Sequence, residues 1–167
     1  MKILSLAFAA ISISGCVAMP QTPDEFVKAS EKTSLIEVHR DEYNRDTDDI
    51  YKVLSKKADE CLNGVITTYQ FHNGNRLAVS YQYTTRVKKT NGGDIRMTVQ
   101  TKPLGATINI GGTPPPDGQY SAVINVKKKQ NGRSKVESYT SFGAGEYYEY
   151  VTSWLGNKST KCLMAGR

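Results

Sequence analysis

The spacing of apolar residues in the first half of the chain predicts one amphipathic helix. Between residues 46 and 64, apolar side chains recur every three or four positions, and lysines occupy the opposite face. Asp46 or Thr47 can cap the start of this helix, and Asn63-Gly64 supplies a glycine suited to a left-handed cap at its end. Its apolar stripe consists of Ile50, Val53, Leu54, Ala58, Cys61 and Leu62.

The sequence around this helix has the features of strands joined by tight turns. Residues 34–40 alternate well enough to form a first strand. After the helix, three Asn-Gly pairs separate runs rich in Val, Ile, Thr and Tyr, and Asn-Gly suits a type I′ turn because both central residues need a positive φ. Pro103 and Gly105 are expected to bend or break the third run. The five expected strands are residues 65–72, 76–89, 94–110, 119–130 and 134–142.

A second helix is expected at residues 144–155, where Gly156 stops it. The resulting order is strand, helix, five-stranded antiparallel meander and helix, which indicates an α+β fold with its helices on one face of a curled sheet. The helix presents an apolar stripe that would line an apolar-ligand cavity or, as is more common for aromatic residues at this spacing, belong to the core. The stripe consists of Tyr147, Tyr148, Val151, Trp154 and Leu155.

This element order, over residues 34–163, resembles that of helix-grip domains, in which a C-terminal helix lies across a strongly bent antiparallel sheet. Domains of that kind occur in the lipoprotein C subunit of the β-barrel assembly machine and in many lipid-binding proteins. The resemblance implies a lipid or apolar-ligand carrier, and no sequence motif accompanies it. A simpler arrangement of two helices on a sheet fits the same pattern.

The first residues have the order of a secretory signal. A positive start at Lys2 is followed by an apolar run of eleven residues, 3–13, and then by two small residues. The run is too short to cross a bilayer as a helix, which needs about 20 residues. Residues 1–15 are therefore expected to direct export and to be removed.

The end of this signal resembles the lipobox of bacterial lipoproteins. Ile13-Ser14-Gly15-Cys16 has the branched apolar residue, the two small residues and the cysteine of that motif. The resemblance implies that Cys16 is lipidated and becomes the mature N-terminus, and two or more acyl chains anchor a protein stably. Because Val17 and not aspartate follows, it also implies the outer membrane, with the protein facing the periplasm. An ordinary signal peptide with a chance cysteine is the alternative.

Removal of the signal would leave 152 residues, the size of one ordinary domain. Residues 16–33 contain two prolines and little periodicity, so they are expected to form the lipidated cysteine and a flexible tether. Residues 34–167 would then form a single α+β periplasmic domain. Cys61 and Cys162 remain as an even pair in an oxidising compartment, which favours a disulfide over two free thiols.

Charge divides the mature chain into two unequal parts. Residues 16–60 hold seven Lys/Arg and eleven Asp/Glu, a net charge of −4, whereas residues 61–167 hold fourteen and five, a net charge of +9. The basic part can meet anionic lipid or an acidic envelope partner, and lysines at strand edges also discourage aggregation. Nucleic acid is a poor candidate in an exported compartment. The expected basic patch near two hairpin tips consists of Arg86, Lys88, Lys89, Lys127, Lys128, Lys129 and Arg133.

The sequence contains no convincing catalytic set. His39 and His72 lie outside any motif that pairs them with Ser or Cys, and neither a CxxC pair nor a clustered metal-ligand set occurs. No catalytic residues, cofactor or metal are therefore expected. The sequence favours a membrane-anchored, non-catalytic adaptor or accessory in envelope assembly or maintenance, with an apolar-ligand carrier as the alternative and an envelope hydrolase as a third hypothesis that rests on location alone.

Overall fold

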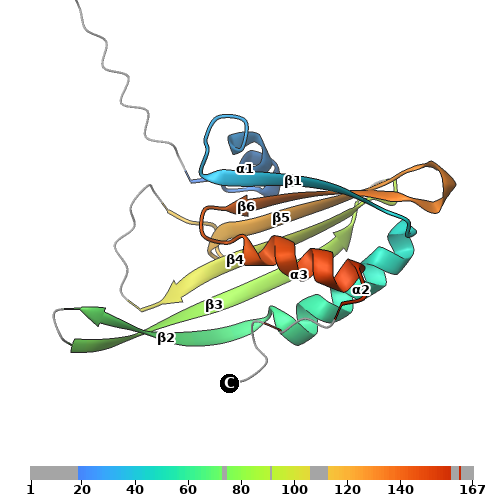
Figure 1. Cartoon of the computed structure of the whole chain (residues 1–167). Helices are drawn as coiled ribbons and strands as arrows, with labels where there is room; N and C mark the ends of the chain where they lie inside the picture. The colour runs from blue at the N-terminus through green and yellow to red at the C-terminus, as the bar shows by residue number, and fades with distance from the viewer. Residues whose placement is uncertain (1–18, 73–74, 91, 106–112, 159–161, 163–167) are drawn as a thin grey trace, which may run out of the picture.

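The computed structural model describes residues 19–72, 75–90, 92–105, 113–158 and 162, and it confirms an α+β fold with an antiparallel sheet (Figure 1). Two of the expected elements begin later than the sequence indicated, the first strand at residue 36 and the last helix at residue 146. The elements are α1 (Pro23–Ala29), β1 (Ile36–Tyr43), α2 (Thr47–Cys61), β2 (Gly64–His72), β3 (Asn75–Lys89), β4 (Ile95–Leu104), β5 (Gln119–Lys128), a short 3-10 turn (Gln130–Gly132), β6 (Ser134–Ser141) and α3 (Glu146–Leu155).

Six strands form one sheet in the order β1-β6-β5-β4-β3-β2. The five strands after α2 follow one another as the expected antiparallel meander, and β1 adds to its far edge by pairing with β6. The two edge strands of the described sheet are therefore β1 on one side and β2 on the other. Between β5 and β6, Asn131 and Gly132 both have positive φ, as a tight turn of this kind requires.

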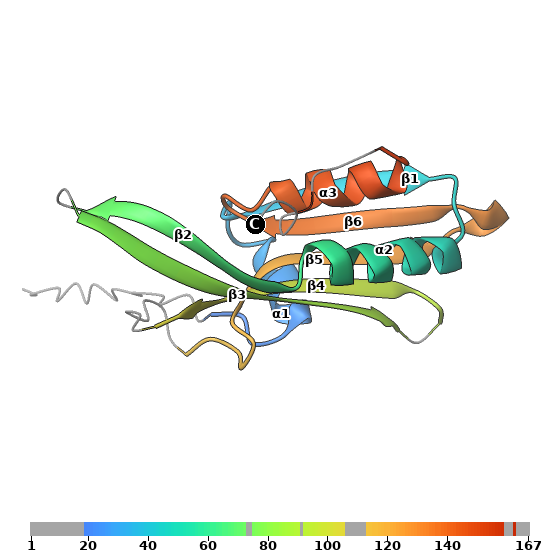
Figure 2. The same ribbon diagram turned by 90° about the horizontal axis from the view of Figure 1, so that it is seen from below.

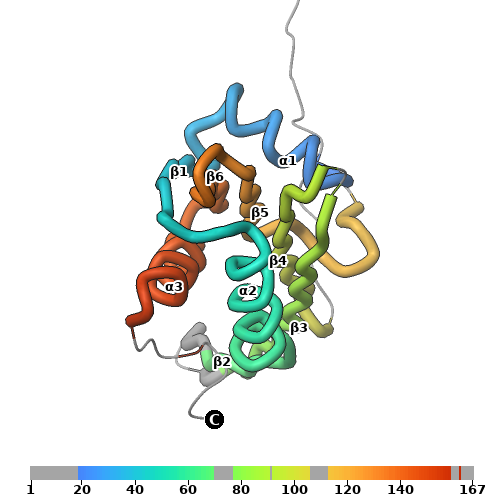
Figure 3. The backbone as a smooth tube through the Cα atoms, turned by 90° about the vertical axis from the view of Figure 1, so that its right-hand side faces the viewer, coloured from blue at the N-terminus to red at the C-terminus, as the bar shows by residue number. Residues whose placement is uncertain are grey.

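The sheet curves around α2 and α3, which lie side by side on its concave face (Figure 3). The apolar stripe of α2 is buried there, as expected, against alternating residues of β4, β5 and β6. Asp46 caps α2 by accepting a hydrogen bond from the Asp48 amide at 2.7 Å. The C-terminal end of α3 is held by Arg45, whose guanidinium donates to the Leu155 carbonyl at 3.1 Å.

The structure overturns the expectation that residues 16–33 form a flexible tether throughout. Residues 23–29 form α1, which lies on the opposite face of the sheet from α2 and α3 (Figure 2). Phe26 is 4% exposed and packs in a second, smaller core with Ile36, Val123 and Tyr139. The sequence carried a signal for this helix, because Thr22-Pro23-Asp24-Glu25 has the spacing of a capping box with proline in the first turn.

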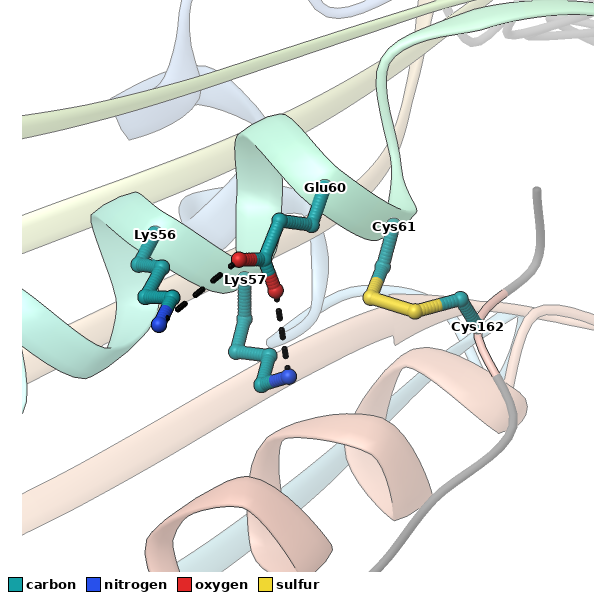
Figure 4. Close-up of a disulfide and its surroundings, with 5 residues drawn as sticks. All are labelled: Lys56, Lys57, Glu60, Cys61 and Cys162. Atoms are coloured by element: carbon teal, nitrogen blue, oxygen red, sulfur yellow. Dashed lines mark hydrogen bonds and ion pairs between the residues drawn. A yellow bond between two sulfur atoms is a disulfide. The ribbon is translucent and has the colours of Figure 1, made fainter. Parts of the chain in front are cut away.

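The Cys61–Cys162 pair is disulfide-bonded in the structure (Figure 4). The two Cα atoms are 4.6 Å apart, within the range that a disulfide requires. Cys61 is fully buried at the end of α2. The bridge therefore fixes the segment after α3 to the last turn of α2.

Candidate functional site

A pocket of about 390 Å³ lies on the face of the sheet that carries α1. Pro23 of α1 and Tyr120 of β5 contribute to its wall. In the described part of the chain, no carboxylate lines it. The rest of its lining comes from β3, from the residue after it and from β4, and comprises Arg86, Lys88, Lys89, Thr90, Arg96, Thr98 and Gln100.

Strand register brings these side chains together. Lys88 pairs with Arg96 across β3 and β4, and Arg86 pairs with Thr98 two positions away, so all four side chains project from the same face. Val87, between Arg86 and Lys88, points to the other face and packs on the main core. The pocket is therefore built by alternation on two neighbouring strands.

A β-bulge adds Tyr120 to this face. Val99 pairs with Ala122 but Gln100 pairs with Tyr120, so one extra residue, Ser121, interrupts the alternation of β5. Strict alternation from Ala122 would have turned Tyr120 toward α2 and α3. Instead its ring lies 6.0 Å from that of Phe26, and it connects α1 to the pocket wall.

Both guanidinium groups of the pocket are held by polar partners. Arg86 Nη1 donates to Asp117 Oδ2 at 2.5 Å, and this bond raises the pKa of Arg86 and lowers the pKa of Asp117. Arg96 Nη2 lies 2.9 Å from Asp24 Oδ1 on α1, and its Nε donates to Asn125 at 2.9 Å. The cations are therefore fixed in position rather than free on long side chains.

The floor of the pocket is polar and buried. Gln100 is 4% exposed and Thr98 is 8% exposed. Gln100 Nε2 donates to the Gly118 carbonyl at 2.9 Å, which fixes the amide orientation. Gly118 has a φ of +98°, and a Cβ there would collide with the backbone of Thr101, so only glycine allows this loop to lie on β4 and carry Asp117 to Arg86.

The structure divides the expected basic patch. Arg86, Lys88 and Lys89 line the pocket, although the Lys89 ammonium is bonded to Asp48 at 2.6 Å. Lys127 and Arg133 instead pair with acids on β6 and β1, and Lys128 and Lys129 lie exposed near the β5–β6 turn. Sequence reasoning missed Arg96, Thr98 and Gln100, which only the pairing of β3 with β4 could reveal.

A second charged cluster surrounds Glu137 on β6. Its side chain is 10% exposed and lies 2.8 Å from Lys135, 3.3 Å from Lys127 and 3.5 Å from Arg40. The hydrogen bond from Lys135 is the main cause that lowers the pKa of Glu137, and Lys127 adds to it. One carboxylate thus lies within ion-pair distance of cations from three strands.

Replacing Glu137 with glutamine should lower the free energy of unfolding by about 1–3 kcal/mol at neutral pH, because it leaves three cations without their shared acceptor. The carboxylate stabilises the fold above its ordinary pKa, and this stability is lost as pH falls through the lowered pKa. Urea denaturation at several pH values would measure both effects.

Glu60→Gln is the matched control, because Glu60 is 44% exposed on α2 beside Lys57 (Figure 4). This substitution should lower the free energy of unfolding by less than about 1 kcal/mol. Equal effects of the two variants would contradict the prediction.

The expected aromatic stripe of α3 belongs mostly to the main core. Tyr147, Val151, Trp154 and Leu155 are 1–4% exposed and are packed with residues of α2 and the sheet. Burial raises the pKa of Tyr147 well above its usual range. These contacts show that the four side chains pack in the core. The binding of an apolar ligand beneath α3 stays a prediction.

The fifth residue of that stripe, Tyr148, faces the edge strand β1. Its ring stacks on His39 with centroids 4.0 Å apart, and its hydroxyl donates to Asp41 at 3.5 Å. Burial, with Asp41 and Tyr148 nearby, raises the pKa of Tyr43 to about 12. His39 thus has a packing role against α3, and the side chain of His72 lies outside the described residues.

Within the described ranges, no cluster of three or more His, Cys, Asp or Glu side chains is arranged to hold a metal ion. No helix in those ranges has the length and apolar character needed to cross a bilayer. Cys16 lies outside the described residues.

Comparison with known proteins gives no functional assignment. No protein-family model matches the chain, and no curated protein is significantly similar to it. One similar solved structure is that of protein Ms6760 from Mycobacterium smegmatis, with 8% sequence identity, 72% of this chain and 80% of that chain covered, and a TM-score of 0.28.

Proposed function

We propose that this chain is an exported lipoprotein, anchored to the outer membrane through lipid on Cys16, whose folded domain is a non-catalytic adaptor in envelope assembly or maintenance. The lipobox-like end of the first sixteen residues supports the anchor. The sequence of the edge strand β2 supports the adaptor role, and it is the observation on which that part of the proposal depends.

Strand β2 is an edge strand of the described sheet, and its sequence lacks the side chains that usually discourage pairing. Its nine residues, GVITTYQFH, contain no lysine, proline or acid, and they are rich in β-branched and aromatic residues. Edge strands with such sequences pair readily with additional strands, so soluble proteins normally place charges or proline there. An edge strand of this length and composition is suited to receive a strand from a partner protein.

The opposite edge of the same sheet is protected. Strand β1 has the sequence IEVHRDEY, in which five of eight residues are charged or histidine. The two edges therefore differ in the property that governs strand addition. Because both belong to one sheet, this difference favours a specific role for β2 over a general tolerance of exposed edges.

The β2–β3 ribbon also exposes apolar side chains on both of its faces. Val65 and Tyr69 are 51% and 55% exposed on one face of the ribbon, and Leu77 is 56% exposed on the other. Figures 1 and 2 show the far end of this ribbon projecting beyond the helices. These side chains would add apolar contacts to a strand that pairs with β2.

A photo-crosslinking amino acid placed at residue 65 should form a discrete adduct with an envelope protein in living cells. The same group at residue 42, on the charged edge, should not form that adduct. Lysine substitutions at Val65 and Tyr69 should abolish the adduct formed from a probe at residue 67, because charge at an edge opposes strand pairing. Gln119→Lys, at an exposed strand position elsewhere, is the charge-matched control. If probes at residues 42 and 65 gave the same adduct, the proposal that β2 is the adaptor surface would be contradicted.

Cys16→Ala should transfer the protein from the membrane fraction to the soluble periplasm, because it removes the acyl chains that anchor it. Fractionation of cells by density would measure the change, with the wild-type protein as the reference. Continued membrane association of the Cys16→Ala protein would contradict lipid anchoring.

A further inference from the structure

The pocket on the α1 face is lined by hydrogen-bond donors and cations. Arg86, Lys88 and Arg96 bring three positive charges to it, whereas the Lys89 ammonium is bonded to Asp48 of α2 on the opposite face. The buried Thr98 and Gln100 form its floor. Guanidinium and ammonium groups converging on one space are the arrangement that binds a multi-oxygen anion.

The acids around the pocket leave one charge in excess. Of the three cations in the pocket, Arg86 is paired with Asp117 and Arg96 with Asp24. Among the described residues, no carboxylate lies within ion-pair distance of the Lys88 ammonium. Lys88 is thus the cation that an incoming anion would meet first, and Asp24, which is 76% exposed beside Arg96, is the carboxylate that would compete with it.

The volume of the pocket and the residues of its wall further limit the class of ligand that would fit. A volume of about 390 Å³ falls in the range of sites for small molecules and headgroups, larger than a single inorganic ion needs. The ring of Tyr120 and the ring of Pro23 give the wall an apolar side. A phosphate attached to an organic group would fit both the cationic and the apolar lining.

The position of Pro23 connects the pocket to the membrane. Pro23 is seven positions after Cys16, so a lipid on Cys16 would hold Pro23 within about 25 Å of the bilayer even with the chain fully extended. This step rests on the proposed lipid anchor. An anchored domain would then present a cationic pocket close to the phosphate layer of its own membrane.

We propose that this pocket binds a phosphate-bearing anion, and that the headgroup of an anionic membrane lipid supplies it. Lys88 and Arg96 bind the phosphate oxygens, Thr98 and Gln100 add neutral hydrogen-bonding groups from the floor, and Tyr120 and Pro23 contact the organic part.

Calorimetric titration of the full-length protein in a non-ionic detergent would test this site. The probes are dihexanoyl phosphatidylglycerol, its zwitterionic phosphatidylcholine counterpart, and inorganic phosphate. Phosphatidylglycerol should bind saturably with one site per chain and at least about tenfold more tightly than phosphatidylcholine, because only the first has a net negative charge. Inorganic phosphate binding as tightly as phosphatidylglycerol would overturn the lipid source and leave a free-phosphate site.

Substitutions distinguish binding in the pocket from non-specific attraction of an anionic lipid to a basic protein. Lys88→Gln should weaken phosphatidylglycerol binding at least about tenfold, the range of one charge-assisted hydrogen bond. Asp24→Asn should tighten it severalfold, since the competing carboxylate is gone. Lys56→Gln, at an exposed lysine of α2, is the matched control and should leave the affinity unchanged. Thermal unfolding of each variant would show that the fold is retained.

Absence of saturable binding by every probe would overturn the proposal, as would equal weakening by Lys88→Gln and Lys56→Gln. These outcomes do not depend on the crosslinking or fractionation results, because the titration measures the pocket in purified protein. A protein that binds phosphatidylglycerol but stays soluble in cells would refute the anchor alone.

Discussion

Replacing Cys61 with alanine should lower the free energy of unfolding by about 4–5 kcal/mol under oxidising conditions, a large part of the stability of a domain of this size. The bridge to Cys162 closes a loop with a sequence separation of 101 residues, and loop-closure entropy in the unfolded chain grows with that length. Urea denaturation followed by tryptophan fluorescence would measure the loss, because Trp154 is buried between α3 and the sheet.

Two comparisons isolate the contribution of the bridge. Wild-type protein in strong reductant should become as unstable as Cys162→Ala, since each has lost only the covalent link. Cys61→Ala should be slightly less stable than both, because Cys61 is fully buried and alanine leaves its sulfur unreplaced. An unchanged unfolding midpoint on adding reductant would show that the bridge contributes nothing.

Replacing Phe26 with alanine should remove about 3–5 kcal/mol of packing, the usual cost of losing a buried phenylalanine. Phe26 is the fully buried residue of α1, and a helix of seven residues has little stability without tertiary contacts. The expected result is release of α1 from the sheet before global unfolding. Limited proteolysis should then cut within residues 23–35 at a protease concentration that leaves the wild type intact.

Lys28→Ala, at an exposed position of the same helix, is the control and should leave proteolysis unchanged. Release of α1 would also remove Pro23 from the pocket wall and separate Asp24 from Arg96. The affinity of Phe26→Ala for phosphatidylglycerol should therefore differ from that of the wild type whenever its protease sensitivity does. Resistance of residues 23–35 to cleavage in Phe26→Ala would show that other contacts hold α1 in place.

Local signals in the sequence determined most of the elements. The period of Ile50, Leu54 and Ala58 with an aspartate cap specified α2, because a helix of fifteen residues needs only its own stripe and caps to be recognised. Alternation and the Asn-Gly turns specified the meander, since sequential strands joined by tight turns pair with their neighbours. The disulfide followed from two cysteines and the expected compartment.

Only the tertiary structure decided where α1 lies and which side chains meet in the pocket. A seven-residue helix with one buried residue is too short to show a repeat of apolar positions. Its capping pattern therefore could not predict a stable helix until the packing of Phe26 on Val123 and Tyr139 was known. Lys88 and Arg96 meet through strand register, and the bulge at Ser121 turns Tyr120 to a face that alternation assigns to the other side. Register and bulges depend on pairing between strands, and no single strand's sequence contains that information.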